Sequence, residues 1–206
     1  MRRSAMLVPI IILGTLLTAP RLHAVTIDFI PVSQETSLGH QVSVDVVIFG
    51  LDAIGEIVSA FDLDVTYDDT ILRATDVLFG PSLGVPFGSD PFDPALAAVT
   101  SFDTSLPGVV DFAELSFLLD DPLHALQGDG FTLASLTFES VGLGTSPLGF
   151  VLDDFNQVVG RSAALLDIGA GTGHVTVVAA AVPAPSTGGL LVVGLIAWAA
   201  RRRSRY

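Results

Sequence analysis

Residues 59–67 alternate strictly between apolar and polar side chains, and this pattern limits the fold of the chain more than any other stretch. The side chains on one face of an extended strand here would be Phe61, Leu63, Val65 and Tyr67. The side chains on the opposite face would be Ala60, Asp62, Asp64 and Thr66. Since successive side chains of a strand point to opposite faces of its sheet, a period of two predicts a half-buried strand.

Other short apolar segments follow the same plan, separated by clusters of Gly, Pro and Asp. The best of them, residues 40–49, would bury Val42, Val44, Val46 and Ile48. We expect the remaining strands at residues 25–30, 71–79, 97–102, 109–119, 131–140, 148–155, 164–168 and 174–178. Nothing between residues 25 and 180 keeps a helical period, so the sequence predicts one all-β sandwich domain. Residues 131–138 do not hold one clean alternation, which predicts either a bulge or a misplaced strand boundary there.

The charges are divided sharply along the chain. All 22 acidic residues lie between residues 25 and 180, where only Arg73 and Arg161 oppose them, a balance of −20 against −13 for the whole chain. Such a charge would repel nucleic acid, so this class of partner is excluded. The chain also has no cysteine, which excludes disulfides, thiolate metal sites and cysteine nucleophiles.

The first 24 residues have the three parts of a secretory signal peptide. Arg2 and Arg3 precede an apolar run at residues 5–17, and a small residue, Ala24, closes the segment. We predict cleavage after Ala24, with an uncleaved membrane anchor as the alternative. Export also agrees with the absence of basic residues from most of the following domain.

Residues 181–206 form a tail of three parts. A hinge at residues 182–187 precedes an apolar run at 188–200, and a basic end at 201–206 begins with Arg201, Arg202 and Arg203. At 1.5 Å per residue the run would span about 20 Å, short of the roughly 30 Å hydrocarbon core. The flanking arginines predict a short transmembrane helix whose end stays on the cytoplasmic side.

This tail resembles the PEP-CTERM sorting signal of Gram-negative bacteria, in which Val-Pro-Glu-Pro precedes a short apolar helix and basic residues. The corresponding motif here is Val182, Pro183, Ala184, Pro185 and Ser186. Ala184 stands where the family usually has Glu. The resemblance implies processing by an exosortase, with an inner-membrane intermediate and a final place at the cell surface or in the extracellular matrix. An ordinary C-terminal anchor is the alternative.

A second resemblance lies at residues 39–79, which look like the opening half of a cohesin-type domain. The likeness rests on the strand at residues 40–49, the Phe-Asp-Leu-Asp-Val-Thr-Tyr-Asp run at 61–68 and the return strand at 71–79. The family usually has Pro at the position of Asp69. The resemblance implies a jelly-roll sandwich of about nine strands, related to carbohydrate-binding modules. It also implies a dockerin-like partner, with Asp62 and Asp64 as candidate contacts.

Residues 80–94 change in character, with four prolines and three glycines that break regular structure. Phe87 and Phe92 lie here beside Asp90 and Asp93. Loops of this length are often functional. We therefore name Phe87 and Phe92 as candidate partner contacts, with a lid folded back on the sandwich as the alternative.

Metal and cofactor signals are sparse. The three histidines of the domain, His40, His124 and His174, have no ligand spacing, so no transition-metal site is predicted. Paired aspartates near turns suit calcium, which takes oxygen ligands, but none has the spacing of an EF-hand loop. We therefore predict no cofactor and no metal site, and expect these aspartates to shape turns, with calcium binding as the alternative.

Together these features predict an exported, non-catalytic binding module rather than an enzyme. One alternative is a structural protein of the exopolysaccharide or biofilm matrix whose assembly calcium assists. Another is a small glycan hydrolase, which would need two carboxyl groups facing each other across a cleft. The only tryptophan, Trp198, lies in the tail, so the domain lacks the usual aromatic platform for polysaccharide.

Overall fold

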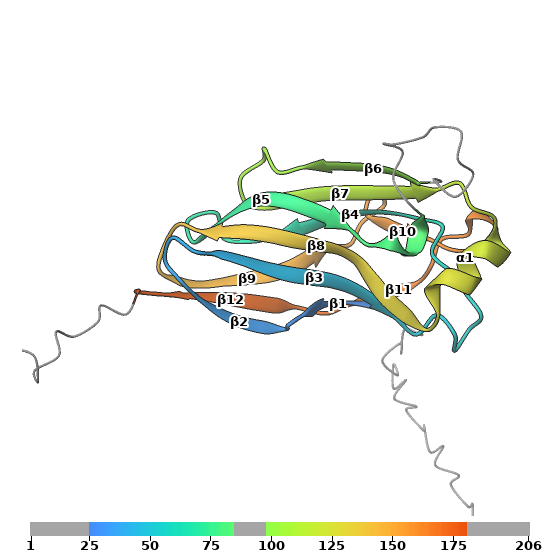
Figure 1. Ribbon diagram of the computed structural model, residues 1–206, viewed down its shortest axis with the longest axis horizontal. Helices are drawn as coiled ribbons and strands as arrows, with labels where there is room; N and C mark the ends of the chain where they lie inside the picture. The colour runs from blue at the N-terminus through green and yellow to red at the C-terminus, as the bar shows by residue number, and fades with distance from the viewer. Residues whose placement is uncertain (1–24, 85–97, 181–206) are drawn as a thin grey trace, which may run out of the picture.

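Two β-sheets stacked face to face make up the described part of this computed structural model, residues 25–84 and 98–180 (Figure 1). The first sheet has, in spatial order, β11 (Ile168–Ala170), β1 (Val25–Ile30), β3 (Gln41–Phe49), β8 (Gly130–Ser140) and β5 (Leu72–Phe79). The second has β2 (Ser33–Ser37), β12 (Gly173–Val178), β9 (Gly144–Val151), β4 (Ala60–Thr66), β7 (Val109–Ser116) and β6 (Ala98–Asp103). A short strand, β10 (Gln157–Val159), pairs with β4 beyond the end of β9. The predicted all-β sandwich is confirmed.

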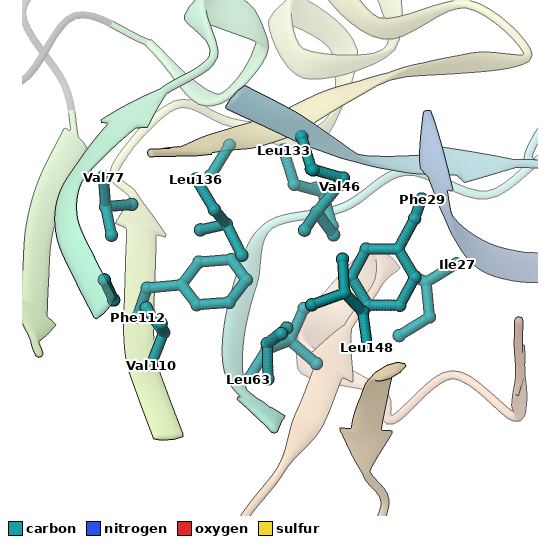
Figure 2. Close-up of a cluster of buried hydrophobic side chains, with 14 of the residues drawn as sticks. Ile27, Phe29, Val46, Leu63, Val77, Val110, Phe112, Leu133, Leu136 and Leu148 are labelled. Atoms are coloured by element: carbon teal, nitrogen blue, oxygen red, sulfur yellow. The ribbon is translucent and has the colours of Figure 1, made fainter. Parts of the chain in front are cut away.

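The core lies between the sheets and is filled by the inward members of each alternation. Figure 2 shows Ile27 and Phe29 of the first sheet pointing toward Leu63 and Leu148 of the second. The predicted inward face of β4 is confirmed: Phe61, Leu63 and Val65 are buried. The Phe29 ring stacks on Phe150 with centroids 4.4 Å apart. Aromatic pairs of this kind add about 0.5–1.5 kcal/mol beyond the area that they bury.

The irregular alternation in β8 has a structural cause. Val46 of β3 pairs with Ala134, whereas the next residue, Val47, pairs with Thr132. Leu133 is therefore an extra residue in β8, and both Leu133 and Ala134 are buried. The predicted bulge is confirmed, because an inserted residue places two neighbouring side chains on the same side of the strand.

The sequence prediction missed the only α-helix in the described residues, α1 (Asp120–Gln127). Its apolar signal is short, since Leu123 and Gln127, one turn apart, are its only buried residues. Two short 3₁₀ turns, η1 (Pro81–Leu83) and η2 (Arg161–Ala163), were also not predicted. Such single turns leave no repeating period to detect.

Several strand predictions were wrong in position or missing. The strand expected at residues 148–155 lies at Gly144–Val151, and the one expected at 164–168 lies at Ile168–Ala170. β2 and β10 were not expected, so the described residues contain twelve strands rather than about nine. β2 is a polar edge strand, Ser-Gln-Glu-Thr-Ser, paired in parallel with β12, and it carries no apolar alternation. β10 has only three residues, too few for a period.

The first and last strands, β1 and β12, both contribute to the core, through residues such as Ile27 and Val175. Both sheets and the core between them are therefore formed within residues 25–180. We expect a domain with these limits to fold without the segments on either side. β12 ends at the opposite end of the sandwich from α1 (Figure 1).

Candidate partner-binding face

The outward face of β10, β4, β7 and β6 carries the candidate site. The alternation of β4 turns Asp62 and Asp64 to this face, where Asp62 is exposed and Asp64 is half-buried. Asp62 lies opposite Ala113 on β7 and opposite Gln157 on β10. Both aspartates predicted as partner contacts therefore lie on one solvent-facing surface of the sheet.

Three aspartates form a row across this face. Asp64 on β4 pairs with Asp111 on β7, which pairs in turn with Asp103 on β6. Like charges directly opposite each other destabilise a sheet. We call Asp62, Asp64, Asp103 and Asp111 the acidic row, because Asp62 lies two residues from Asp64 on the same face.

Within the acidic row the charged forms of Asp62 and Asp111 are disfavoured, whereas hydrogen bonds from Ser105 lower the pKa of Asp103. Partial burial and the neighbouring Asp64 raise the pKa of Asp62. Partial burial also raises the pKa of Asp111, and the charges of Asp62, Asp64 and Asp103 raise it further. A raised carboxyl pKa means that the charged form is disfavoured. A bound cation would relieve this repulsion.

No lysine or arginine of the described residues lies on this face. Of the two arginines in the domain, Arg73 pairs with Glu139, which belongs to the first sheet. Arg161 pairs with Asp120 at 3.9 Å and donates from Nε to the carbonyl oxygen of Gly55 at 3.3 Å. Both cations are therefore engaged away from the acidic row.

An apolar hollow of about 420 Å³ lies beside the acidic row. The small outward side chains of Ala60 and Ala113 form its floor. Val99, Leu115 and Phe155 line it, with 48%, 47% and 82% of their surfaces exposed. We call this surface the apolar hollow. Asp62 lines the apolar hollow and is also a member of the acidic row, so the two surfaces meet at this residue.

Hydrogen bonds hold the loop that presents Phe155. Asp153 Oδ1 accepts the backbone N–H groups of Phe155 at 2.8 Å and of Asn156 at 3.0 Å, and these bonds, with one from the Asn156 side chain, lower its pKa. Asn156 Nδ2 donates to Asp153 Oδ1 at 3.0 Å and reaches Asp64 Oδ2 at 3.4 Å. These hydrogen bonds stabilise the loop that exposes the Phe155 ring to solvent, and the bond to Asp64 connects this loop to the acidic row.

The sequence prediction found two residues of this face and missed the others. Asp111 and Leu115 belong to a predicted strand. The face of the sheet on which they lie depends on strand pairing, which the sequence of one strand does not reveal. Phe155 was expected at the end of a strand, whereas it lies in the loop between β9 and β10. Phe87 and Phe92 lie outside the described residues, and so do the motif at residues 182–186 and the arginines at 201–203. Their roles stay predictions.

No group of three or more His, Cys, Asp or Glu side chains that could hold a metal ion occurs within residues 25–84 and 98–180. The members of the acidic row lie along one face of a sheet and do not converge as a ligand set does. Calcium binding by this chain stays a prediction.

Residues 181–203 match the protein family described as the PEP-CTERM protein-sorting motif. The resemblance inferred from Val182 to Ser186 and the following apolar and basic residues is therefore confirmed. In the described part of the chain, no helix is long and apolar enough to cross a membrane. No curated protein is significantly similar to the chain in sequence.

The sandwich is similar in structure to cohesin domains. The seventh ScaB type I cohesin from Pseudobacteroides cellulosolvens matches with a TM-score of 0.57 at 19% identity, covering 80% of this chain and 98% of the matched chain. A type I cohesin–dockerin complex from Clostridium thermocellum gives a TM-score of 0.56 at 14% identity, covering 75% of this chain and 99% of the matched chain. A type II cohesin domain from the cellulosome of Acetivibrio cellulolyticus gives 0.55 at 17% identity, covering 74% and 95%. At these identities the likeness establishes the fold alone.

Proposed function

We propose that this protein is an exported, non-catalytic binding module that docks a partner protein on the outward face of β10, β4, β7 and β6. One observation carries the proposal: an apolar hollow and an acidic row lie side by side on an exposed sheet face. Exposed apolar surface rimmed by polar residues marks interaction sites.

The composition of the face suits a protein partner. Phe155, 82% exposed, and Leu115, 47% exposed, are large apolar side chains that gain much from being covered. Aromatic anchors of this kind are enriched at the centres of protein interfaces. The cohesin-like fold supports the same conclusion, because one similar structure is that of a cohesin–dockerin complex.

The sorting motif gives the module its place in the cell. A PEP-CTERM motif belongs to a protein that is exported, processed at the membrane and sorted to the cell surface. We propose that an exosortase-type enzyme recognises residues 182–186 and that the released module works at the surface or in the matrix of a Gram-negative cell. The signal peptide predicted at residues 1–24 is consistent with this route.

The face can be tested by blocking it without changing its charge. Ala113→Gln places a long neutral side chain on the floor of the apolar hollow, and we expect at least a tenfold loss of affinity for a partner captured from the native cells. The matched control is Ser43→Gln, at an exposed position on the outer face of the first sheet. Affinity is measured by titrating the purified partner against residues 25–180.

The control should bind as the unchanged domain does, and both variants should unfold at the temperature of that domain. Equal affinity of the unchanged domain and the folded Ala113→Gln variant would exclude this face as the docking surface. A loss caused only by Ser43→Gln would move the site to the other sheet.

A further inference from the structure

We infer that the outer edge of β6 accepts an extended segment of another protein as an added strand, and that this segment carries a lysine or arginine opposite Thr100. The segment extends the second sheet by one strand. Its inward apolar side chains fill the groove between β6 and β5, and its cation pairs with Glu114. This second binding surface is separate from the outward face proposed above and does not depend on it.

The edge of β6 lacks the features that protect the other edges. The strands at the ends of the two sheets are β11 and β5 in the first and β2 and β6 in the second. β11 has three residues, β2 is polar throughout, and β5 is interrupted by a register shift between Ala74 and Asp76. β6 pairs with β7 over six consecutive residues without a shift, and its single charged residue, Asp103, lies at its end. Short length, charges and bulges are the usual protection of a sheet edge.

The outer edge of β6 presents backbone groups that can bond to a further strand. In an antiparallel pair, successive residues alternate between directing their N–H and C=O groups toward the neighbouring strand and away from it. β7 therefore takes about half of the backbone groups of β6. Among the described strands, none pairs with the other side of β6. An extended segment can form main-chain hydrogen bonds along this side, which is the source of affinity in strand addition.

A groove of about 550 Å³ lies between β6 and β5, where both sheets end. Figure 1 shows these two strands on the side of the sandwich opposite β2. The groove is lined by Val77 and Phe79 of β5 and by Thr100 and Phe102 of β6, among others. Phe102 belongs to the inward face, since it pairs with the buried Phe112, yet 47% of its surface is exposed. A strand added to β6 turns alternate side chains into this groove, and apolar ones cover Phe102.

Glu114 determines the charge that the segment carries. It lies on β7 directly opposite Thr100 and on the same inward face as Phe112. Glu114 is 1% exposed, and neither carboxylate oxygen has a hydrogen-bond partner among the described residues. A residue opposite Thr100 on the added strand would lie two strand spacings, about 10 Å, from Glu114. A lysine or arginine there extends over the short side chain of Thr100 and supplies the missing donor.

A second copy of β6 is a poor occupant of this edge. The inward residues of β6 are Ala98, Thr100 and Phe102, whose partners on β7 are all buried. None of the three carries a positive charge, so a second β6 brings no cation to Glu114. Residues 25–180 also carry a formal charge of −20, which opposes self-association. These features favour a segment of a different protein, with alternating apolar residues and one cation among them.

Synthetic peptides of about ten residues test the inference, with residues 25–180 as the receptor. The probe alternates Val and Thr and has Lys in place of one central Val; the matched peptide has norleucine, a neutral side chain of similar length, at that position. The titrations are made at pH 8, because burial raises the pKa of Glu114 to about 7. We expect the lysine peptide to bind at least fivefold more tightly than the norleucine peptide. In Glu114→Gln this difference should fall below twofold.

Methylation of the peptide backbone tests the strand pairing itself. N-methyl groups on every second residue block either the N–H groups that face β6 or those that face away from it. We expect one of these two patterns to weaken binding of the lysine peptide at least twentyfold and the other to change it less than threefold. Equal effects of the two patterns would show that the peptide does not bind as a strand.

Variants assign the binding to the groove. Phe102→Ser should weaken binding of both peptides at least fivefold. The matched control is Phe49→Ser on β3 of the first sheet, where 40% of the residue is exposed. This control and Ala113→Gln, which alters the outward face, should each change the affinities less than twofold. Melting temperatures no lower than that of the unchanged domain establish that the variants are folded.

Three results would each overturn the inference: no binding of the lysine peptide at 1 mM, an undiminished preference for lysine in Glu114→Gln, or a loss in Phe49→Ser or Ala113→Gln equal to that in Phe102→Ser. Sedimentation velocity of the unbound domain should show a monomer. A dimer that Phe102→Ser dissociates would also overturn the inference and would identify a second copy as the occupant of the edge.

Discussion

Replacing Gln127 by Ala should lower the free energy of unfolding by about 3–5 kcal/mol. Gln127 is buried at the end of α1 and makes three hydrogen bonds. Its Oε1 accepts the N–H of Val58 at 2.8 Å, while its Nε2 donates to the carbonyl oxygens of Val58 at 2.6 Å and of Ser82 at 3.2 Å. Val58 is fully buried, so its N–H and C=O would lose these partners where water does not reach. Each buried group left without a partner costs about 1–3 kcal/mol.

Urea unfolding of residues 25–180 measures this effect. The matched control is Leu126→Ala on the same helix, where the side chain is 54% exposed and the expected loss is below about 1 kcal/mol. Equal stability of the two variants would contradict the role of Gln127 as the residue that joins α1 to the segment before β4 and to η1.

Replacing Glu114 by Gln should stabilise the protein by about 2–3 kcal/mol at pH 8 and have almost no effect at pH 4. Glu114 points inward from β7, is only 1% exposed, and neither carboxylate oxygen has a hydrogen-bond partner among the described residues. Burial raises its pKa from the ordinary value of 4.5 to about 7. The folded protein therefore holds this proton more tightly than the unfolded chain does.

The sign of the pH dependence follows from linkage. Below pH 4.5 both states are protonated and the stability is fully present; it falls as the pH rises from about 4.5 to about 7 and is constant above that value. A pKa difference of this size corresponds to about 3 kcal/mol. Glutamine stays neutral and removes this loss.

Unfolding curves of both proteins at pH 4 and pH 8 provide the measurement. Glu35→Gln, which removes a carboxylate from an exposed position on β2, is the matched control and should show no such difference between the two pH values. Stability that is equal for Glu114→Gln and the unchanged domain at pH 8 would mean that Glu114 has a partner or access to water in solution.

The fold was predictable from local sequence wherever one face of a strand is buried and the other is exposed to solvent. β3 and β4 are of this kind, and residues such as Val44 and Leu63 are buried as expected. β2 and α1 were not predictable, for different reasons. β2 is polar and pairs with β12, a strand that follows it by more than 130 residues. The position of α1 depends on Gln127, a polar side chain whose partners lie far away in the sequence.

The binding face was predictable only in part. Alternation alone turned Asp62 and Asp64 outward, because β4 has a clear apolar side. The acidic row also needs Asp111 opposite Asp64 and Asp103 opposite Asp111, and these positions depend on the register of three strands. The register depends on how the strands pair in the folded protein, so the sequence of one strand does not determine it. Phe155 was missed because its exposure depends on the turn that Asp153 stabilises.

The C-terminal segment was readable from its local sequence alone. The expected sorting signal is confirmed by the family match at residues 181–203. The acidic residues lie between the two ends, and seven of the nine arginines lie in the end segments. This division of charge agrees with export of the acidic domain, and the cytoplasmic position expected for the basic ends stays a prediction.

Site-specific photo-crosslinking in the native cells tests the docking face most directly. A benzophenone side chain is placed at Ala113 or Ser101 on the proposed face, or at Ser43 or Gln41 on the outer face of the first sheet. We predict that irradiation gives one heavier crosslinked species from positions 113 and 101 and none from positions 43 and 41. Crosslinks from positions 43 and 41 with none from positions 113 and 101 would contradict the account.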